Sequence, residues 1–229
     1  PDFICHCHFL RDIGKDLFDE DYAVIRKRIK KHKIRAVLWR KTKQLRNIIG
    51  DDPQAASSLC EGIENGSIDC MVMDKMQAIA AYAMVLWTFD KSELEGYGFP
   101  FDCPHLIFYQ RLKKLHGLIN AQRIKDKTLS RLWRPLTKVI EDPQLKKAAS
   151  KMQNKVQTFN KLREALSIAA PGSKKGLNDD GVGADIKSTE EKVKRFRNEQ
   201  MPDSENYEKM ADQIDQYWEK LFADPITVT

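Results

Sequence analysis

Apolar residues recur three or four positions apart along most of this chain, the spacing that aligns them on one face of an α-helix. Polar residues fill the positions between them, and Gly, Pro and Asn-Gly sequences separate the periodic stretches. The pattern predicts helices at residues 9–17, 22–49, 54–64, 67–89, 105–121, 127–140 and 143–170, and two more after residue 187 that are divided at 202–204.

The stretch 143–170 has the most regular pattern, an apolar repeat of seven that predicts a seam against another helix, interrupted by Lys155. The seam consists of Leu145, Ala148, Met152, Phe159, Leu162, Leu166 and Ala169. Residues 171–185 are poor in apolar side chains, which predicts a mobile loop. Ser188 and Glu191 fit a capping box, so the next helix is predicted to begin there.

Short β-prone stretches lie at the two ends of the chain, at residues 2–7 and 226–229. Two lone strands do not make a stable sheet. Partner strands are therefore expected outside this sequence, and the chain is predicted to be the interior of a longer protein. The predicted fold class is mainly α, a multi-helix, bundle-like unit with strand fragments at both ends.

The composition agrees with a helical chain that folds around a core. Of 229 residues, 41% are hydrophobic and 31% charged, and the length suffices for one or two domains. The longest nearly uncharged run, 76–89, is shorter than the ~20 residues that cross a bilayer, so no membrane partner is expected. Five cysteines without regular spacing and without a signal peptide before them favour a reducing, cytoplasmic setting.

The formal net charge of +6 is concentrated near the start of the chain. Residues 1–50 hold thirteen Lys/Arg against six Asp/Glu, and residues 23–49 hold eleven Lys/Arg and no acid. Like charges on one helix repel by ~0.2–0.5 kcal/mol per neighbouring pair. A phosphate backbone would relieve that repulsion and release counterions. The alternative is a basic surface balanced by acidic neighbours elsewhere in the fold. The predicted nucleic-acid contacts are Arg26, Lys27, Lys30, Lys31, Arg35, Arg40, Lys41, Lys43 and Arg46.

Two cysteines and two histidines occupy consecutive positions 5–8 and raise the question of a metal site. In a strand, neighbouring side chains point to opposite faces, so the four could not close around one zinc ion. A structural strand end is the favoured reading, and a zinc protein that uses Cys5 and His8 is the weaker one. Core packing is predicted for Trp39, Trp87, Trp133 and Trp218, and an aromatic plug for residues 96–101.

The stretch CHCHFLRDIGKDL, residues 5–17, resembles a segment of DDE-type transposases, in particular Mutator-like and related bacterial insertion-sequence enzymes. In that family a Cys-x-x-His motif follows the second catalytic aspartate and leads into a helix with an Arg-Asn or Arg-Asp pair. Cys5, His8, Arg11 and Asp12 match the pattern. The match covers about a dozen residues. The remainder is similar in architecture to the helical insertion that precedes the last catalytic glutamate.

The resemblance implies a ribonuclease-H-like α/β catalytic domain to which the strand fragments at both ends belong. Its Asp, Asp and Glu bind two divalent ions, Mg²⁺ or Mn²⁺, for DNA cleavage and strand transfer. These carboxylates would lie outside the present chain, so no residue here is predicted to be catalytic or to bind a metal. Cys5, His8, Arg11 and Asp12 would have structural or supporting roles, and this segment alone would be inactive.

The resemblance divides the chain into segments with different expected roles. A strand and basic helices at 1–50 would continue from the catalytic core, the helical insertion would span 51–170, and a mobile loop 171–187. Residues 188–229 would return to the core strand. The implied partner is DNA at mobile-element ends and targets, in a bacterial or archaeal cytoplasm at the nucleoid, and a homo-oligomer is compatible with such an enzyme. The alternative is a non-enzymatic helical module that binds nucleic acid or protein.

Overall fold

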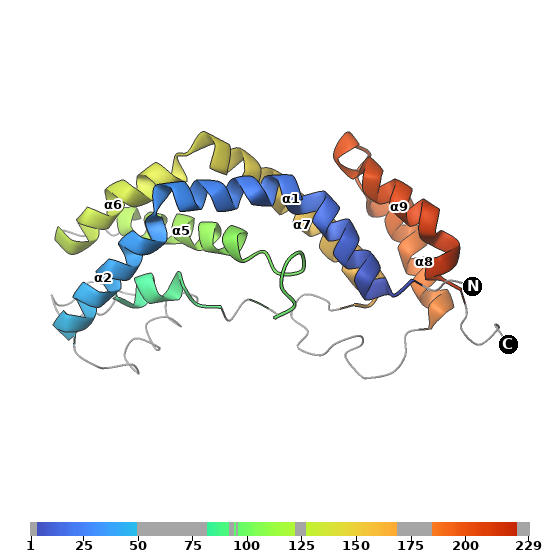
Figure 1. The fold of residues 1–229 in the computed structure, drawn as a ribbon, viewed down its shortest axis with the longest axis horizontal. Helices are drawn as coiled ribbons and strands as arrows, with labels where there is room; N and C mark the ends of the chain where they lie inside the picture. Colours follow the sequence, from blue (N-terminus) through green and yellow to red (C-terminus); the bar gives the residue numbers. More distant parts are fainter. Residues whose placement is uncertain are drawn as a thin grey trace. The chain divides into compact units, whose positions relative to one another are not determined.

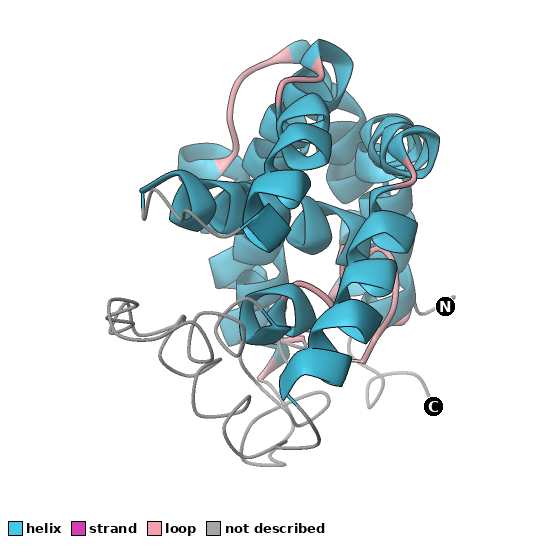
Figure 2. Cartoon of the chain, turned by 90° about the vertical axis from the view of Figure 1, so that its left-hand side faces the viewer, coloured by secondary structure: helices cyan, strands magenta, loops and turns pink. Residues whose placement is uncertain are grey.

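A computed structural model of the chain describes residues 4–49, 82–91, 94, 96–121, 127–168 and 185–223. These residues form helices and connecting loops, with no strand among them (Figure 2), so the mainly α prediction is confirmed. The elements in Figure 1 are α1 (His6–His32), α2 (Ile34–Ile49), α5 (Pro104–Ala121), α6 (Lys127–Ile140), α7 (Pro143–Ala165), α8 (Ile186–Arg195), the π-helical turn η1 (Phe196–Gln200) and α9 (Glu205–Leu221). The predicted helix 54–64, the loop 171–184 and the strand 226–229 lie outside the described residues.

The chain forms two compact units, each built from segments far apart in the sequence. Unit 1 consists of residues 1–22, 94–103 and 150–229, and unit 2 of residues 23–93 and 104–149. Both α1 and α7 contribute residues to each unit. The units therefore do not coincide with the contiguous segments expected from the sequence.

In unit 1 the first part of α1 runs antiparallel to both α7 and α9. The Phe18 and Phe159 rings meet edge to face at 5.2 Å, and Lys155 Nζ lies 2.8 Å from Asp21 Oδ2. Lys155, which interrupts the heptad seam, thus pairs with α1 instead of entering the core. The described seam residues are all buried. They are Leu145, Ala148, Met152, Phe159, Leu162 and Leu166.

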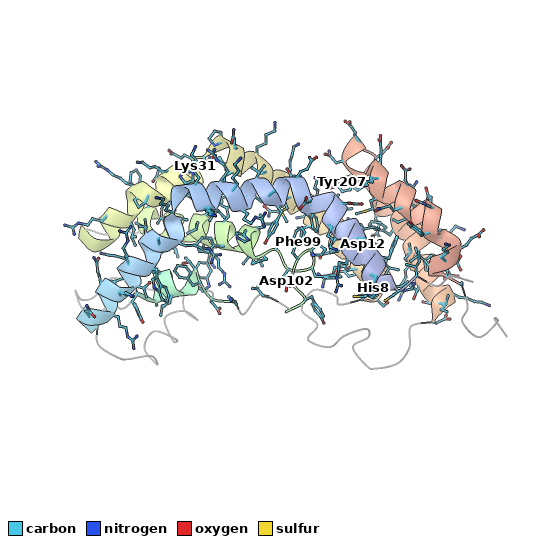
Figure 3. The ribbon with its side chains drawn as sticks, viewed as in Figure 1. His8, Asp12, Lys31, Phe99, Asp102 and Tyr207 are labelled. Atoms are coloured by element: carbon cyan, nitrogen blue, oxygen red, sulfur yellow. The ribbon has the colours of Figure 1, made fainter. Side chains whose placement is uncertain are left out.

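The connector 96–103 packs its aromatic rings onto unit 1 as the sequence predicted. Phe99 stacks on Tyr22 with ring centroids 4.5 Å apart, and Phe101 lies 6.0 Å from Phe159 (Figure 3 labels Phe99). Helix α1 approaches this connector closely at Gly14. A Cβ atom at that position would lie 2.6 Å from Pro100 Cγ.

The helices α8 and α9 form an antiparallel hairpin at the end of unit 1 (Figure 1). Trp218 Nε1 donates to Glu190 Oε1 at 3.2 Å, and Arg197 pairs with Asp215 at 2.8 Å. The break predicted at 202–204 is confirmed, with Ser204 as the N-cap of α9. The capping box at Ser188 is wrong, because α8 begins at Ile186 and Asp185 accepts the hydrogen bond of the Ser188 N–H.

The start of the chain differs from the prediction in two ways. His6 and Cys7 belong to α1, so the strand predicted for residues 2–7 does not include them. A single helix runs to His32, and the interruption falls at Lys33, whose φ of 51° is left-handed. The spacing of the buried residues explains why the helix is interrupted at Lys33. Ile29 and Ile34 are five positions apart, which places them on different sides of one straight helix, so both can be buried only if the helix changes direction between them.

Candidate nucleic-acid interface

The two units carry opposite net charge. Unit 2 contains 24 Lys/Arg and 11 Asp/Glu, a net charge of +13, whereas unit 1 contains 15 and 22, a net charge of −7. Among the described residues of unit 2 the numbers are 21 and 3. The three acids are Asp90, Glu141 and Asp142. The acidic neighbours that would balance the basic segment are therefore few in this part of the chain.

The second part of α1 separates its apolar and basic faces. Ile25 and Ile29 are buried, which turns Arg26, Lys27, Lys30 and Lys31 to the exterior. All four are exposed, and Figure 3 shows Lys31 on the outer side of the helix. Lys27 and Lys31 follow a buried isoleucine by two positions and so lie on the opposite side of the helix, whereas Arg26 and Lys30 follow one by a single position and lie at the edge of the apolar face.

Helix α2 repeats this arrangement with one exception. Its buried residues are Ile34, Leu38 and Leu45, while Arg35, Arg40, Lys43 and Arg46 are exposed. Lys41, which the sequence predicted to contact nucleic acid, is only 8% exposed and is not counted in the basic surface defined below. Position 41 lies three residues from Leu38 and four from Leu45, on the apolar face. We call Arg26, Lys27, Lys30, Lys31, Arg35, Arg40, Lys43 and Arg46 the basic surface.

Asp142 pairs with two residues of the basic segment, and its interactions lie within unit 2. Its side chain is 1% exposed, and Oδ2 lies 2.7 Å from both Arg28 Nε and His32 Nε2. Oδ1 accepts the N–H groups of Gln144 and Leu145 at the start of α7. Burial opposes ionisation, but hydrogen bonds from His32 and Arg28 prevail and lower the pKa of Asp142 from 3.8 to about 2.

The basic residues of α1 and α2 act on a common neighbour, His105 in the first turn of α5. Burial lowers the pKa of His105, and the positive charges of Arg35 and Arg26 lower it further. Cations from two helices therefore converge on one locality in unit 2. Arg35 also lies over the Phe108 ring, with its Cζ 4.3 Å from the centroid.

Two tryptophans that were predicted to be in the core are exposed. Trp39 on α2 is 54% exposed and Trp133 on α6 is 40% exposed, whereas Trp87 is buried. Each exposed ring stands one position beyond a buried leucine, Leu38 or Leu132, so it falls off the apolar face of its helix. The positions of the two tryptophans relative to Leu38 and Leu132 indicate their exposure in the sequence. Counting apolar residues without their helical phase does not reveal it.

The residues of the transposase-like motif lie at the start of α1 in unit 1. Cys5, His8 and Asp12 are exposed and Arg11 is partly exposed, with His8 and Asp12 one turn apart (Figure 3). Asp12 lies 3.7 Å from Lys15 Nζ. In the part of the chain that the structure describes, no three His, Cys, Asp or Glu side chains are grouped to hold a metal ion.

The described cysteines offer no buried nucleophile. Burial raises the pKa of Cys103 to about 12, and Asp102 raises it too, against the opposing charge of Arg163. The thiol therefore stays protonated, and nucleophilic chemistry needs the thiolate.

No protein-family model, curated protein or solved structure matches the chain. None of the helices within the described ranges has the length and apolar character needed to cross a membrane.

Proposed function

We propose that the chain binds DNA through the basic surface of unit 2. One observation carries the proposal: 21 Lys/Arg against 3 Asp/Glu in the described residues of that unit, with eight of the nine predicted contact residues exposed. Within the described residues, the buried Asp142 pairs with Arg28 and His32, which are not part of the basic surface. A row of exposed cations on consecutive helices matches the phosphates of a nucleic-acid backbone.

The resemblance of residues 5–17 suggests the setting in which this binding would operate. We propose that the chain is the helical insertion region of a DDE-type transposase and holds the DNA of a mobile element. In that proposal the chain adjoins a ribonuclease-H-like domain, whose carboxylates hold Mg²⁺ or Mn²⁺ outside this sequence. The basic surface would then contact the DNA backbone, and DNA cleavage and strand transfer would occur elsewhere in the protein.

The DNA-binding proposal is tested by the salt dependence of binding to a short labelled duplex, followed by fluorescence anisotropy. Each phosphate contact contributes about 0.9 to the slope of log affinity against log salt. Replacing Lys27, Lys30 and Lys31 together with glutamine should reduce the slope by up to ~2.7 and weaken binding at low salt. Glutamine keeps helix propensity, so α1 should remain folded.

The matched control removes three exposed cations from unit 1, as Lys192→Gln, Lys194→Gln and Arg195→Gln on α8. This variant changes the net charge equally and should leave the slope unchanged. If both triple variants lower the slope to the same extent, binding follows total charge and the basic surface is not the contact site.

The transposase setting is tested separately from DNA binding. The codons flanking this sequence in its source gene should encode an aspartate-containing sheet upstream and a glutamate-bearing helix downstream. The purified chain alone should not nick supercoiled DNA with Mg²⁺ or Mn²⁺. Stop codons on both sides would instead favour the non-enzymatic helical module, and metal-dependent cleavage by the isolated chain would contradict the expected position of the carboxylates.

A further inference from the structure

The large apolar side chains that stand exposed in the described part of the chain are Val24, Trp39 and Trp133, and all three belong to unit 2. Burial of an indole ring contributes some of the largest stabilisation available to a side chain. Trp39 and Trp133 are both exposed in the more basic unit. A ligand that is negatively charged and has flat rings would interact with the cations and with both indoles.

Trp39 lies on the same side of α2 as the cations of the basic surface. Arg35 and Lys43 are four residues before and after it, one turn away in each direction, and Arg40 is adjacent. The Phe89 ring meets the indole at 84°, with centroids 5.9 Å apart, which supports the ring on one side. The residue is nonetheless 54% exposed, so a large part of its surface is available to a ligand.

Trp133 is held in place by its own helix and by α5. Its ring stacks on His116 at 5.9 Å and an interplanar angle of 25°. His116 Nε2 lies 2.9 Å from Thr137 Oγ1, which donates to the Trp133 carbonyl oxygen at 2.9 Å. His116 lies against one side of the ring, and Trp133 as a residue is 40% exposed. The exposed Arg134 follows directly in the sequence.

These observations distinguish between kinds of nucleic acid. In a duplex the faces of the bases are already stacked on each other, so an indole can reach them only by unstacking a base step, which costs a few kcal/mol. An unpaired strand offers free base faces beside its phosphates, and stacking on aromatic side chains contributes ~1–3 kcal/mol per base. The cations one turn on either side of Trp39 fit such a strand, in which every nucleotide carries one phosphate and one base.

We infer that unit 2 binds an unpaired DNA strand, with Trp39 and Trp133 stacking on its bases while the basic surface contacts its phosphates. This inference rests on the proposed DNA binding and specifies the form of the DNA. The helices that carry the two rings, α2 and α6, pack against each other in unit 2, so one strand can engage both elements.

The test measures the affinity of the full chain for oligothymidylate, for a duplex of equal length and for oligouridylate, at one fixed salt concentration. Trp39→Leu should weaken binding to oligothymidylate at least about fivefold, the equivalent of ~1 kcal/mol. Trp39→Phe should restore most of the affinity, because it restores the ring. Trp133→Leu should have a smaller effect in the same direction. Duplex affinity and the salt slope should stay unchanged in all three variants.

Trp218→Phe is the matched control, since this half-buried indole lies in unit 1 and bonds to Glu190. Equal losses for duplex and single strand, or no loss for either, would overturn the stacking inference while leaving duplex binding intact. Oligouridylate binding that is tighter and equally dependent on Trp39 would overturn the choice of DNA. If Trp39→Leu abolishes only self-association of the chain, a second copy covers the rings and the inference is wrong.

Discussion

Asp142 connects several polar groups of unit 2 through one buried carboxylate. One carboxylate neutralises Arg28, bonds to His32 and caps the first turn of α7. Its bond to His32 joins the start of α7 to α1, across 110 positions of the sequence. A group with so many partners and 1% exposure cannot be lost without leaving a cation and two N–H groups unpaired.

We expect Asp142→Asn to destabilise the protein by ~2–3 kcal/mol, because Arg28 keeps its charge in a mostly buried position without a counter-ion. Urea unfolding followed by circular dichroism measures the change. In a double-mutant cycle with Arg28→Gln, the two losses should not add, since both variants break the same interaction. Additive losses would contradict the pairing.

The same residue predicts a pH dependence. The pKa of Asp142 falls from 3.8 to about 2 on folding, so its stabilising contribution is complete above pH ~4 and disappears as the pH drops through ~2. The contribution amounts to ~2 kcal/mol. Stability measured across this range should decline more steeply in the wild type than in Asp142→Asn. Parallel curves for the two proteins would contradict the lowered pKa.

At the scale of elements, the contact between α1 and the connector constrains Gly14. Alanine normally stabilises a helix interior by ~0.5–1 kcal/mol relative to glycine. At Gly14, however, a Cβ atom would lie 2.6 Å from Pro100 and 2.9 Å from Phe159, which is closer than van der Waals contact. We expect Gly14→Ala to destabilise the protein by ~1–2 kcal/mol in thermal unfolding, because the connector or α7 must move.

Gly117 provides the matched control within α5. A Cβ atom there has nothing within 4 Å, and the residue is exposed. Gly117→Ala should therefore raise stability by ~0.5–1 kcal/mol, the opposite sign. If both substitutions stabilise the protein, helix propensity dominates and the close approach of Pro100 to α1 does not exist in solution.

The elements also show where sequence reasoning worked and where it failed. The helix at 127–140 and the helix starting at Pro143 were predicted correctly, because turn residues and periodicity are local properties. The interruption at Lys33 was missed, since no glycine or proline marks it and it follows from where Ile29 and Ile34 must be buried. Of the candidate site, the exposed cations of α1 were predicted, while the burial of Lys41 and the exposure of Trp39 and Trp133 were not.

At the scale of the whole molecule, the net charge of +6 is the sum of +13 on unit 2 and −7 on unit 1. A uniformly basic protein would bind only to a cation exchanger at neutral pH. We expect this chain to be retained on both cation and anion exchangers at ~0.1 M salt, where the screening length is only ~10 Å and each unit presents a field of its own sign. The glutamine triple variant at Lys27, Lys30 and Lys31 should elute earlier from the cation exchanger only. Passage through the anion exchanger without retention would contradict the charge separation.

The sequence by itself determined the helical class, the positions of most helix ends and the basic segment after Tyr22, since each depends on neighbours a few residues away. Only the tertiary structure decided which charged side chains and which aromatic rings are exposed. Asp142 selects Arg28 and His32 from a run of similar cations by approaching them from a distant part of the chain. Likewise, the segregation of charge between units arises because folding brings 104–149 to the basic helices and 150–229 to the acidic start of α1. Such choices depend on contacts between distant segments, and local patterns carry no information about them.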